Sequence, residues 1–350
     1  MSQTQQSNRA APGPSLMPLI GIFTISRLIY VAAELGLADK MADGSRSADE
    51  LATETRTHGR SLYRMLRALT AYGVFAETEP GKFGLTTMGT QLRSDVPGSV
   101  RNFARFFGDQ RSWRCYADIE HTIRTGETAM RRVYGMGSFE YYAEHPAEAS
   151  IFNGAMAEVT RRVGSAATAA YDFSMFRAIM DVGGGNGALI AELLRAAPAA
   201  RGILFDLPAG LREAQQVLTT TGVAERCTIV PGDFFKSVPT GADAIVLKSV
   251  IHDWDDASAT SILGNCRAAA SANTRLLLIE RVMPARMTAS PASQRAAVLD
   301  IRMLLVAGGR ERTEEEYRAL LASGGFTLTR TVMLPEPIDM AVIEAVPRAP

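Results

Sequence analysis

The sequence predicts an α/β protein in which a doubly wound, mainly parallel sheet of seven strands follows a smaller all-α or winged-helix domain. Three observations support this fold class. From about Tyr171 onward, short apolar runs alternate with helical segments, which is typical of a parallel sheet covered by helices on both faces. Before Tyr171, apolar residues recur mainly at helical spacing. The length of 350 residues exceeds one ordinary core and indicates more than one domain.

The composition is that of an ordinary soluble protein. Apolar residues make up 47% of the chain, charged residues 21%, and 37 basic residues balance 37 acidic ones. This balance gives no bulk electrostatic reason to bind nucleic acid or an anionic membrane. The cysteines Cys115, Cys227 and Cys266 are scattered without CxxC spacing, so neither a disulfide framework nor a zinc site is indicated. We therefore expect a cytoplasmic protein.

The N-terminal region divides into a polar tail and an apolar helix. Residues 1–14 contain Pro12 and Pro14 and lack the pattern of a signal peptide, so we expect a disordered tail. From Leu16 to Ala42, apolar residues follow helical spacing and cover much of the circumference, which predicts a helix buried on several sides. Its most apolar part carries Arg27 and is shorter than the roughly 20 residues of a membrane span, which favours packing within a protein.

Residues 45–92 read as helix, turn, helix and short hairpin, with Pro80 and Gly81 in the hairpin turn. This order is that of a winged helix, which can bind DNA through its second helix, here residues 62–71, or serve as a packing or dimerisation module. The arginines near that helix are interleaved with apolar residues, and the chain has no basic excess. We therefore favour the packing or dimerisation module.

Residues 101–170 are predicted to be helical and are rich in aromatic side chains. Core packing explains most of these side chains, but aromatic and methionine residues in a connecting region can also form a pocket for an aromatic ligand. Both interpretations remain open from the sequence.

The C-terminal half contains the sheet. The predicted strands are residues 178–182, 202–206, 227–230, 244–249, 275–282, 326–334 and 340–346. Helical segments separate the first five strands. A short loop at Pro335 and Pro337 joins the last two, which we expect to pair as an antiparallel hairpin at or near one edge.

The first of these strands runs into a glycine-rich loop, "DVGGGNG", in which Gly183 and Gly185 allow a sharp turn and a close approach to a ligand. The loop also fits the dinucleotide pattern G-x-G-x-x-A, so it does not by itself distinguish NAD from S-adenosylmethionine. Asp181 at the mouth of the loop would oppose a pyrophosphate but suits the cationic S-adenosylmethionine.

Two further acids follow the next two strands. Asp206 ends the second strand, where a carboxylate can accept hydrogen bonds from ribose hydroxyls. Asp233 follows the third strand, where it can accept from the adenine amine while Phe234 stacks on the ring. Either Asp can instead cap a helix or form a turn. Three acids at three successive strand ends favour a cationic ligand across this edge of the sheet.

These motifs carry a resemblance. Residues 178–350 resemble a class I S-adenosylmethionine-dependent methyltransferase. From about residue 15 the whole chain resembles the O-methyltransferases of plant caffeate metabolism and bacterial natural products. The blocks that carry this are "DVGGGNG", "FDLP", "GDFF", "LKSVIHDWDD", "IERVMP" and "GGRERTEEEYRALLASGGF".

The resemblance implies a domain organisation and partners. It implies a winged-helix dimerisation domain at residues 15–100, a helical linker at 101–170 that contributes to the substrate pocket, and a catalytic domain at 171–350 that binds S-adenosylmethionine. It further implies a homodimer that methylates a hydroxyl of an aromatic or polyketide-like small molecule, without nucleic acid or membrane as a partner.

The resemblance also implies residue roles. His252 is the expected general base, with Glu280 and Glu311 as supporting carboxylates. Which of the two touches the imidazole stays open. The expected donor-binding residues are Asp181, Gly183, Gly184, Gly185, Asp206, Leu207, Gly232, Asp233, Phe234, Lys248 and Ser249. The expected acceptor-lining residues are Asn153, Met156 and Met303, for which core packing is the alternative.

The expected chemistry is transfer of a methyl group to a phenol. Phenols titrate near 10 and histidine near 6.5, so we expect a mostly neutral imidazole at pH 7 that can take the phenol proton. On an extended strand, Lys248 would share a face with Val250 and His252. Lys248 can otherwise simply end the strand.

The run "HDWDD" also contains metal-ligand residue types. Its consecutive residues diverge in direction at a helix start, and no second ligand group has suitable spacing, so we expect no metal. Asp255 or Asp256 is more simply a helix cap. The other histidines, His58, His121 and His145, are expected on the surface or in packing. An NAD-dependent oxidoreductase and a ligand-responsive transcription regulator are the alternative functions.

Overall fold

The computed structural model describes residues 15–336 and 338–349, and the chain divides into two compact units, Met1–Asp109 and Gln110–Pro350. The predicted tail at residues 1–14 and Pro337 lie outside the described residues. Residues 101–109 group with the first unit and residues from 110 onward with the second. The functional division into residues 15–100, 101–170 and 171–350 stays a prediction.

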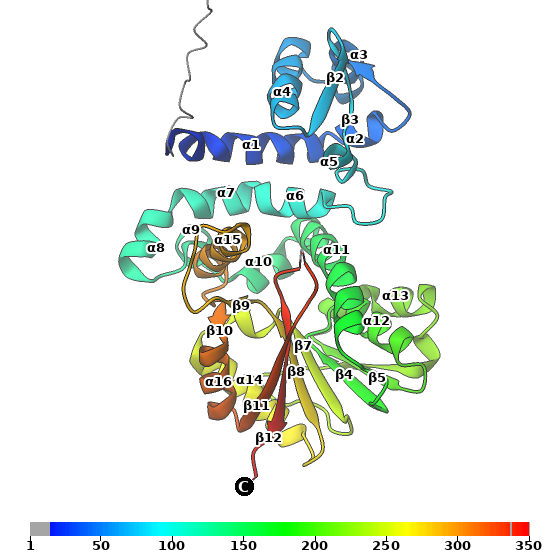
Figure 1. Cartoon of the computed structure of the whole chain (residues 1–350), viewed down its shortest axis with the longest axis vertical. Helices are drawn as coiled ribbons and strands as arrows, with labels where there is room; N and C mark the ends of the chain where they lie inside the picture. The colour runs from blue at the N-terminus through cyan, green and yellow to red at the C-terminus, as the bar shows by residue number, and fades with distance from the viewer. Residues whose placement is uncertain (1–14, 337, 350) are drawn as a thin grey trace, which may run out of the picture. The chain divides into compact units, whose positions relative to one another are not determined.

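The first unit begins with helix α1 (Met17–Glu34), followed by the short α2 (Leu37–Lys40) (Figure 1). The single helix predicted from Leu16 to Ala42 is therefore wrong. Gly36 adopts φ +61° between the two helices, a left-handed conformation that glycine tolerates without strain. The predicted burial on several sides is also wrong, because apolar side chains of the first turns, such as Leu19 and Ile20, are exposed.

The rest of the first unit has the predicted order of helix, helix and hairpin. Helices α3 (Ala48–Thr55) and α4 (Gly59–Ala71) precede the antiparallel strands β2 (Phe75–Glu79) and β3 (Lys82–Leu85). The short β1 (Arg46–Ser47) pairs with β3 and completes a sheet of order β1-β3-β2. The helices α5 (Thr87–Thr90) and α6 (Arg101–Gly108) follow. Buried apolar residues of α3, α4 and the hairpin form the core, including Leu51, Leu66 and Phe83.

The second unit begins with five helices. They are α7 (Gln110–Ala117), α8 (Ile119–Thr125), α9 (Ala129–Tyr134), α10 (Ser138–Glu144) and α11 (Pro146–Ala170). Helix α15 (Pro291–Val306), far along the chain, packs against α7, α8 and α9. Their shared core includes Cys115, Met130 and Leu305.

A seven-stranded sheet of order β11-β12-β8-β7-β4-β5-β6 forms the centre of this unit (Figure 1). Its strands are β4 (Ala178–Val182), β5 (Arg201–Asp206), β6 (Cys227–Pro231), β7 (Ala244–Lys248), β8 (Arg275–Glu280), β11 (Phe326–Met333) and β12 (Ala341–Pro347). The first five are mutually parallel, whereas β12 is antiparallel to β8 and β11 is antiparallel to β12 at the edge. The doubly wound fold and the antiparallel edge hairpin are confirmed.

Helices cover both faces of the sheet, so each central strand is buried on both sides. Ile179 of β4 belongs to one core with α11, α12 (Ala188–Ala196) and α13 (Ala214–Thr220). The next residue, Met180, belongs to the opposite core with α14 (Asp256–Ala269) and α16 (Glu314–Ser323). This alternation explains why these strands read as continuous apolar runs.

The predicted strand at residues 275–282 is divided. Strand β8 ends at Glu280, and β9 (Val282–Met283) pairs in parallel with β10 (Arg312–Thr313) in a separate two-stranded sheet. Both strands of this ladder have only two residues, which is too short for a periodic apolar pattern. The ladder brings the segment after Glu280 beside the segment after Gly309.

Candidate functional site

The carboxyl ends of the parallel strands place most of the predicted donor-binding residues at one edge of the sheet. Asp181 lies in β4, and Gly183, Gly184 and Gly185 follow it. Asp206 ends β5, Asp233 follows β6, and Lys248 ends β7. Ligands of open α/β sheets bind at this edge, outside the strand ends.

Each glycine of the loop is required for a local reason. Gly183 has φ +71°, and a Cβ there would lie 2.8 Å from Cγ2 of Val250. A Cβ on Gly184 would lie 2.6 Å from Cγ of Asp181. Gly185 has φ +58° and would meet no heavy atom within 4 Å, so its backbone borders open space. At Gly185 the loop therefore presents backbone groups toward that space.

Asp206 ties the glycine loop to β5. Its Oδ2 accepts a hydrogen bond from the Gly185 N–H (2.7 Å) and its Oδ1 accepts one from the Leu207 N–H (2.6 Å). Burial raises the pKa of Asp206, while these two hydrogen bonds oppose the rise. The structure thus gives Asp206 a turn-forming role in addition to the predicted ligand role.

The segment after β6 is stabilised in a similar way. The Phe235 N–H donates to Oδ1 of Asp233 (2.9 Å). A Cβ on Gly232 would lie 2.3 Å from the Phe205 ring, so close packing requires glycine there. The rings of Phe234 and Trp254 meet edge to face at 6.2 Å.

The prediction that Lys248, Val250 and His252 share one face of an extended strand is wrong. Strand β7 ends at Lys248, and Ser249 has φ +52°, which breaks the alternation of an extended strand. His252 instead lies in the 3₁₀ turn Ile251–Asp253. Nζ of Lys248 donates to Oγ of Ser249 (3.3 Å). Burial lowers the pKa of Lys248, and the charges of Glu280, Asp181 and Asp253 oppose this.

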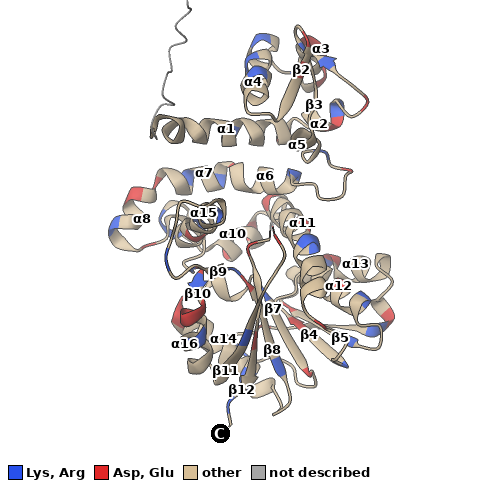
Figure 2. Cartoon of the chain, viewed as in Figure 1, with Lys and Arg blue, Asp and Glu red and all other residues tan. Residues whose placement is uncertain are grey.

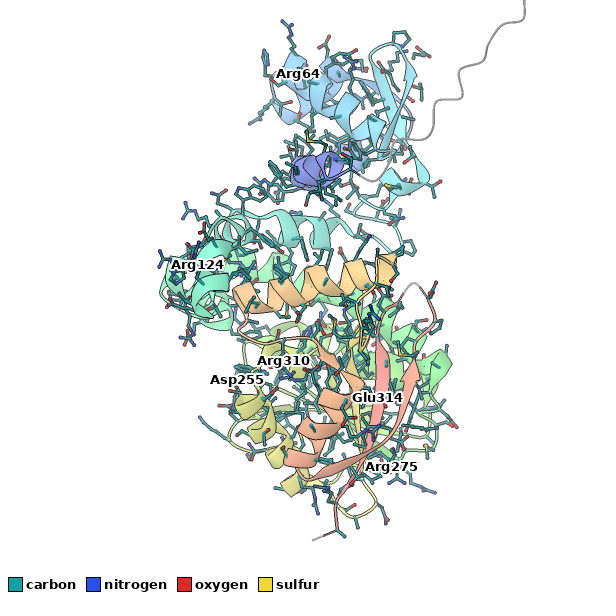
Figure 3. The ribbon with its side chains drawn as sticks, turned by 60° about the vertical axis from the view of Figure 1, so that its left-hand side comes forward. Arg64, Arg124, Asp255, Arg275, Arg310 and Glu314 are labelled. Atoms are coloured by element: carbon teal, nitrogen blue, oxygen red, sulfur yellow. The ribbon has the colours of Figure 1, made fainter. Side chains whose placement is uncertain are left out.

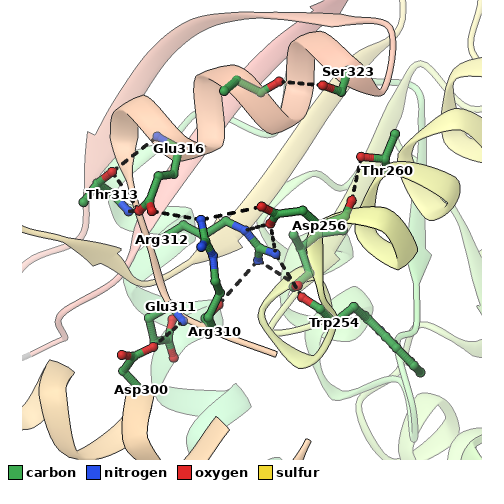
Figure 4. Close-up of polar contacts among 12 residues, drawn as sticks. Trp254, Asp256, Thr260, Asp300, Arg310, Glu311, Arg312, Thr313, Glu316 and Ser323 are labelled. Atoms are coloured by element: carbon green, nitrogen blue, oxygen red, sulfur yellow. Dashed lines mark hydrogen bonds and ion pairs between the residues drawn. The ribbon is translucent and has the colours of Figure 1, made fainter. Parts of the chain in front are cut away.

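The turn that carries His252 is held at its backbone by buried charged groups. Oε1 of the fully buried Glu280 accepts from the N–H groups of Val250 (2.9 Å) and Ile251 (2.8 Å). The guanidinium of Arg312 donates to the carbonyls of Ile251 (3.1 Å) and Trp254 (2.9 Å). Figure 4 shows that the same guanidinium also pairs with Asp256, at 2.7 Å.

The loop before β10 closes on the same turn. The Arg310 N–H donates to the carbonyl of His252 (2.9 Å). A Cβ on Gly309 would lie 2.0 Å from that carbonyl oxygen, so this backbone approach is open only to glycine. Oδ1 of Asp300, on α15, accepts from the Glu311 N–H (2.9 Å) (Figure 4). The imidazole of His252 is therefore presented by a rigid turn.

Carboxylates surround the imidazole. Nδ1 of His252 lies 3.0 Å from Oε1 of Glu311 and 3.9 Å from Oε2 of Glu280. The structure thus assigns the direct contact to Glu311, a choice that the sequence left open. Nε2 lies 3.6 Å from Oδ1 of Asp253, so a sequence neighbour also faces the ring. His252, Glu280 and Glu311 are brought together as predicted.

The expectation of a mostly neutral imidazole is wrong for the site without donor. Burial lowers the pKa of His252, but Glu280, Asp253 and Glu311 together outweigh it and raise the pKa to about 10. Burial also raises the pKa of Glu280 to about 6 and that of Asp253 above its usual value. At pH 7 the imidazole therefore carries a proton until another positive charge enters the site.

The predicted acceptor-lining residues are in different places. Asn153 on α11 borders a hollow with Asn186 of the glycine loop and Gly210, and so faces the donor edge. Met156 is half-buried on α11, and Met303 is buried on α15. Near Asn153, the rings of Tyr142 and Phe152 stack at 4.6 Å. Their roles as acceptor contacts stay predictions.

Sequence reasoning missed several charged and aromatic residues that lie at the site. They are Asp253, Trp254, Arg281, Asp300 and Arg312. The available signal was an arginine directly after each of the two predicted acids, in "ERV" and "ERT". Asp255, by contrast, caps α14 as predicted, since its side chain accepts from the Ser258 N–H (2.8 Å).

The residues at this edge fit S-adenosylmethionine. Oδ2 of Asp181 is buried and has no hydrogen-bond partner within residues 15–336 and 338–349, so it offers an acceptor for an ammonium group. Burial is the main cause that raises the pKa of Asp181 to about 7, and a cationic ligand would favour its ionised form. The open side of Gly185 and the acids Asp206 and Asp233 complete a site suited to a cation with a ribose and an adenine.

Comparison with known proteins identifies the family. Residues 116–327 match the O-methyltransferase domain, and residues 17–95 match the O-methyltransferase dimerisation domain. The phenazine O-methyltransferase PhzM of Lysobacter antibioticus is 40% identical over 98% of this chain and 99% of its own length. The O-demethylpuromycin-O-methyltransferase of Streptomyces alboniger is 39% identical over 95% of this chain and 88% of its own length.

Solved structures agree. The crystal structure of LaPhzM, 40% identical, aligns with a TM-score of 0.89 over 95% of this chain and 98% of that one. NcsB1 from neocarzinostatin biosynthesis, solved with S-adenosylmethionine and a hydroxy-methyl naphthoic acid, aligns with a TM-score of 0.81 at 32% identity over 96% of this chain and 100% of that one. A phenazine-1-carboxylate N-methyltransferase of Pseudomonas aeruginosa is 32% identical over 91% of this chain and 92% of its own length. The chain belongs to the O-methyltransferase family and is an S-adenosylmethionine-dependent O-methyltransferase.

Proposed function

We propose that this enzyme methylates a hydroxyl of an aromatic or polyketide-like secondary metabolite, with His252 as the general base and without a metal ion. The observation that carries the proposal is the 3.0 Å contact between Nδ1 of His252 and Oε1 of Glu311. A carboxylate on one imidazole nitrogen fixes the tautomer and leaves the other nitrogen to take a proton.

The chain's residues then perform three tasks. Glu280 and Arg312 hold the turn, so that the imidazole is oriented before the acceptor arrives. Glu311 accepts a hydrogen bond from the Nδ1–H and stabilises the imidazolium that forms when Nε2 takes the proton of the acceptor hydroxyl. The donor is held by the residues at the carboxyl ends of the strands, namely Asp181, the loop glycines, Asp206, Leu207, Gly232, Asp233, Phe234, Lys248 and Ser249. The bound donor supplies an electrophilic methyl carbon on a sulfonium for in-line displacement.

A base of this kind favours oxygen over nitrogen as the acceptor atom. A phenol titrates near 10 and becomes a good nucleophile only as its proton leaves, whereas a neutral amine already presents a free electron pair. The buried His252, with its carboxylate partner, supports a hydroxyl acceptor for this chain, although an N-methyltransferase is among its relatives.

We also propose that turnover needs no metal. Within the described ranges, no group of three or more His, Cys, Asp and Glu side chains is arranged to hold a metal ion. The nearest candidates, His252 and its carboxylates, already contact one another through the atoms that would bind a metal. Turnover that survives dialysis against EDTA would support the proposal, and activity that returns only with added Mg²⁺ or Zn²⁺ would contradict it.

Exposed apolar residues of α1 support a homodimer. Leu16, Met17, Leu19 and Ile20 are all exposed, and Figure 2 shows few charged residues along this helix. An exposed apolar face of this kind is stabilised when another surface covers it and removes it from water. In the described part of the chain, α1 is long and apolar enough to cross a membrane by length and composition alone, a property that core helices of soluble proteins can share. The match of residues 17–95 to a dimerisation domain favours a second copy of this chain as the partner that covers α1. We propose that this homodimer is a soluble cytoplasmic enzyme.

The direct test of the function is label transfer from the methyl-labelled donor to a panel of aromatic hydroxy compounds, each paired with its amino analogue. We expect transfer to one or more hydroxy compounds and little or none to the paired amines. Transfer to the amines alone would contradict the proposed chemistry, and hydride exchange with NAD in place of methyl transfer would favour an oxidoreductase. Asn153→Ala, Met156→Ala and Met303→Ala are expected to raise the acceptor KM more than they alter donor affinity.

A further inference from the structure

Arg281 and Glu311 lie side by side because of the short β9–β10 ladder. In its register, Val282 pairs with Arg312 in parallel. The residues directly before this pair are Arg281 and Glu311, so the ladder places their backbones next to each other. Arg281 also directly follows Glu280, so both glutamates that lie near Nδ1 of His252 adjoin this arginine in space or in sequence.

The guanidinium of Arg281 is anchored at one end and faces Glu311 with the other. Its Nη1 donates to the carbonyl of Asp339 (3.1 Å) and lies 3.5 Å from Oδ2 of that residue. Its Nε lies 4.0 Å from Oε1 of Glu311. Nε and Nη2 of the Arg295 guanidinium in turn donate to the two carboxylate oxygens of Asp339, at 2.5 and 2.9 Å. A chain of charges thus runs from the more exposed Arg295 to the buried Glu311.

Two buried atoms at this junction have no hydrogen-bond partner in the described part of the chain. They are Nε of Arg281 and Oε2 of Glu311. The closest approach of this Nε is to Oε1 of Glu311, at 4.0 Å, so the two buried groups attract one another through their opposite charges, an attraction that is screened only weakly in the protein interior. The geometry is therefore that of an ion pair that orients the carboxylate without a hydrogen bond of its own.

The negative charges around Glu311 favour a second cation near its carboxylate, in addition to His252. Three further carboxylates lie close by, namely Glu280 from β8, Asp253 from the His turn and Asp300 from α15. The other polar or charged groups around this cluster are Lys248 from β7, Arg312 from β10 and Tyr317 from α16. Like charges this close repel one another, so a neighbouring cation stabilises the arrangement in which Glu311 accepts the hydrogen bond from Nδ1 of His252.

We propose that Arg281 is a positioning residue for the Glu311–His252 pair: anchored by Asp339, its positive charge keeps the Glu311 carboxylate directed at the imidazole. This role rests on the proposed function of His252 as the base. Arg281 does not touch the acceptor or the donor in this account. It acts through Glu311, and its charge matters more than its exact shape.

The first test is the pH dependence of single-turnover methyl transfer in Arg281→Gln. The productive form, with neutral His252 and ionised Glu311, has fewer bound protons than its competitors. Loss of a positive charge therefore raises the proton affinity of the whole cluster. We expect the acidic limb of the rate profile to move to higher pH by on the order of one unit, with recovery toward the wild-type rate at high pH. A purely structural role would lower the rate at every pH without moving the limb.

Two further variants separate charge from packing. Arg281→Lys retains the charge, and we expect its acidic limb to stay close to that of the wild type. Arg275→Gln removes the same charge from Arg275 (Figure 3), at the start of β8, the strand that ends just before Arg281. Arg275 lies 3.8 Å from Glu344, and we expect no change in the limb. If Arg281→Gln does not fold, a lysine variant whose limb moves despite its charge would overturn the proposal.

A second readout does not depend on activity. In donor-free protein labelled at histidine Cε1, the His252 resonance can be identified by its loss in His252→Gln, and its titration followed by NMR. We expect Arg281→Gln to move this titration to higher pH and Arg275→Gln to leave it unchanged. If His252→Gln keeps full turnover, the proposed base fails whatever Arg281 does. If His252 is essential but neither the limb nor the titration moves in Arg281→Gln, the role of Arg281 alone is refuted.

Discussion

Oε1 of Glu311 lies 3.0 Å from Nδ1 of His252, although 59 residues separate them in the sequence. The contact depends on the β9–β10 ladder and on Asp300, which accepts the Glu311 N–H at 2.9 Å. A carboxylate fixed in this way determines which nitrogen of the imidazole carries its proton. The orientation of this imidazole is thus set by a segment remote from it in sequence.

Glu311→Gln should therefore reduce turnover without loss of donor binding. The amide cannot stabilise an imidazolium by charge, so we expect kcat to fall by about 10²-fold, the lower range of a general-base contribution. Single-turnover rates and calorimetric affinity for S-adenosylhomocysteine would measure the two effects. The matched control is Glu314→Gln, an exposed acid at the start of α16 (Figure 3), which should leave both values unchanged. Unaltered turnover in Glu311→Gln would refute its role.

Gly309→Ala should displace the base while the domain stays folded. Its Cβ would lie 2.0 Å from the His252 carbonyl oxygen, a distance that backbone atoms cannot accommodate without moving the turn. We expect a loss of about 1 to 3 kcal/mol of stability, as for overpacking, together with a large fall in kcat. Thermal unfolding and turnover would show both.

The control for this change is Gly264→Ala. Gly264 lies in α14, and a Cβ there meets nothing within 4 Å. Alanine at this helical position should stabilise the protein by roughly 0.5 to 1 kcal/mol and leave kcat unchanged. Equal loss of activity in the two variants would show that the close approach of Gly309 to the turn is not the cause of the lower kcat.

Donor binding should release a proton from the site. The three acids that surround His252 raise its pKa to about 10, so the imidazole is charged at pH 7 in the donor-free enzyme. In the proposed mechanism the sulfonium lies within methyl-transfer distance of the oxygen that His252 deprotonates, and we expect its positive charge to lower the pKa of that imidazole. Calorimetry in buffers of different ionisation enthalpy should show more proton release for S-adenosylmethionine than for S-adenosylhomocysteine, whose sulfur is neutral. Equal release by the two ligands would contradict this linkage.

The exposed face of α1 should hold the dimer together. Ile20→Glu places a charge among apolar side chains that are exposed in the single chain, where Ile20 is 64% exposed. We expect a shift toward monomer in light scattering coupled to size exclusion. Met175→Glu, which alters an apolar residue of similar exposure (60%) in the second unit, should stay dimeric. A dimer that persists in Ile20→Glu would place the interface elsewhere.

The sequence predicts those parts of the molecule that depend on local or periodic signals. All seven strands of the sheet were predicted because the sequence shows apolar runs with helices between the parallel strands, although the edge strands β6 and β11 are partly exposed. The break at Gly36 was missed because its neighbours continue the helical pattern on both sides. The predicted burial of α1 was wrong because apolar spacing does not show whether a face is covered by the same chain.

The site shows the same division. The strand-end acids and the glycine loop carry signals in the sequence, as does the pairing of His252 with distant glutamates through its resemblance to a family. The geometry of the His252 turn carries no such signal, because it depends on the positive φ of Ser249, a position where the sequence has no glycine to indicate that conformation. The raised pKa of His252 is also invisible in the sequence, since it is the sum of burial and three carboxylates from separate segments.

The most direct test of the account is single-turnover methyl transfer by His252→Gln beside His58→Gln, a histidine that contacts Ser61 in the first unit. We expect His252→Gln to retain its affinity for S-adenosylhomocysteine and to lose about 10² to 10⁴ in rate, and His58→Gln to match the wild type. A His252→Gln enzyme that transfers methyl at the wild-type rate would contradict the central claim that this imidazole removes the acceptor's proton.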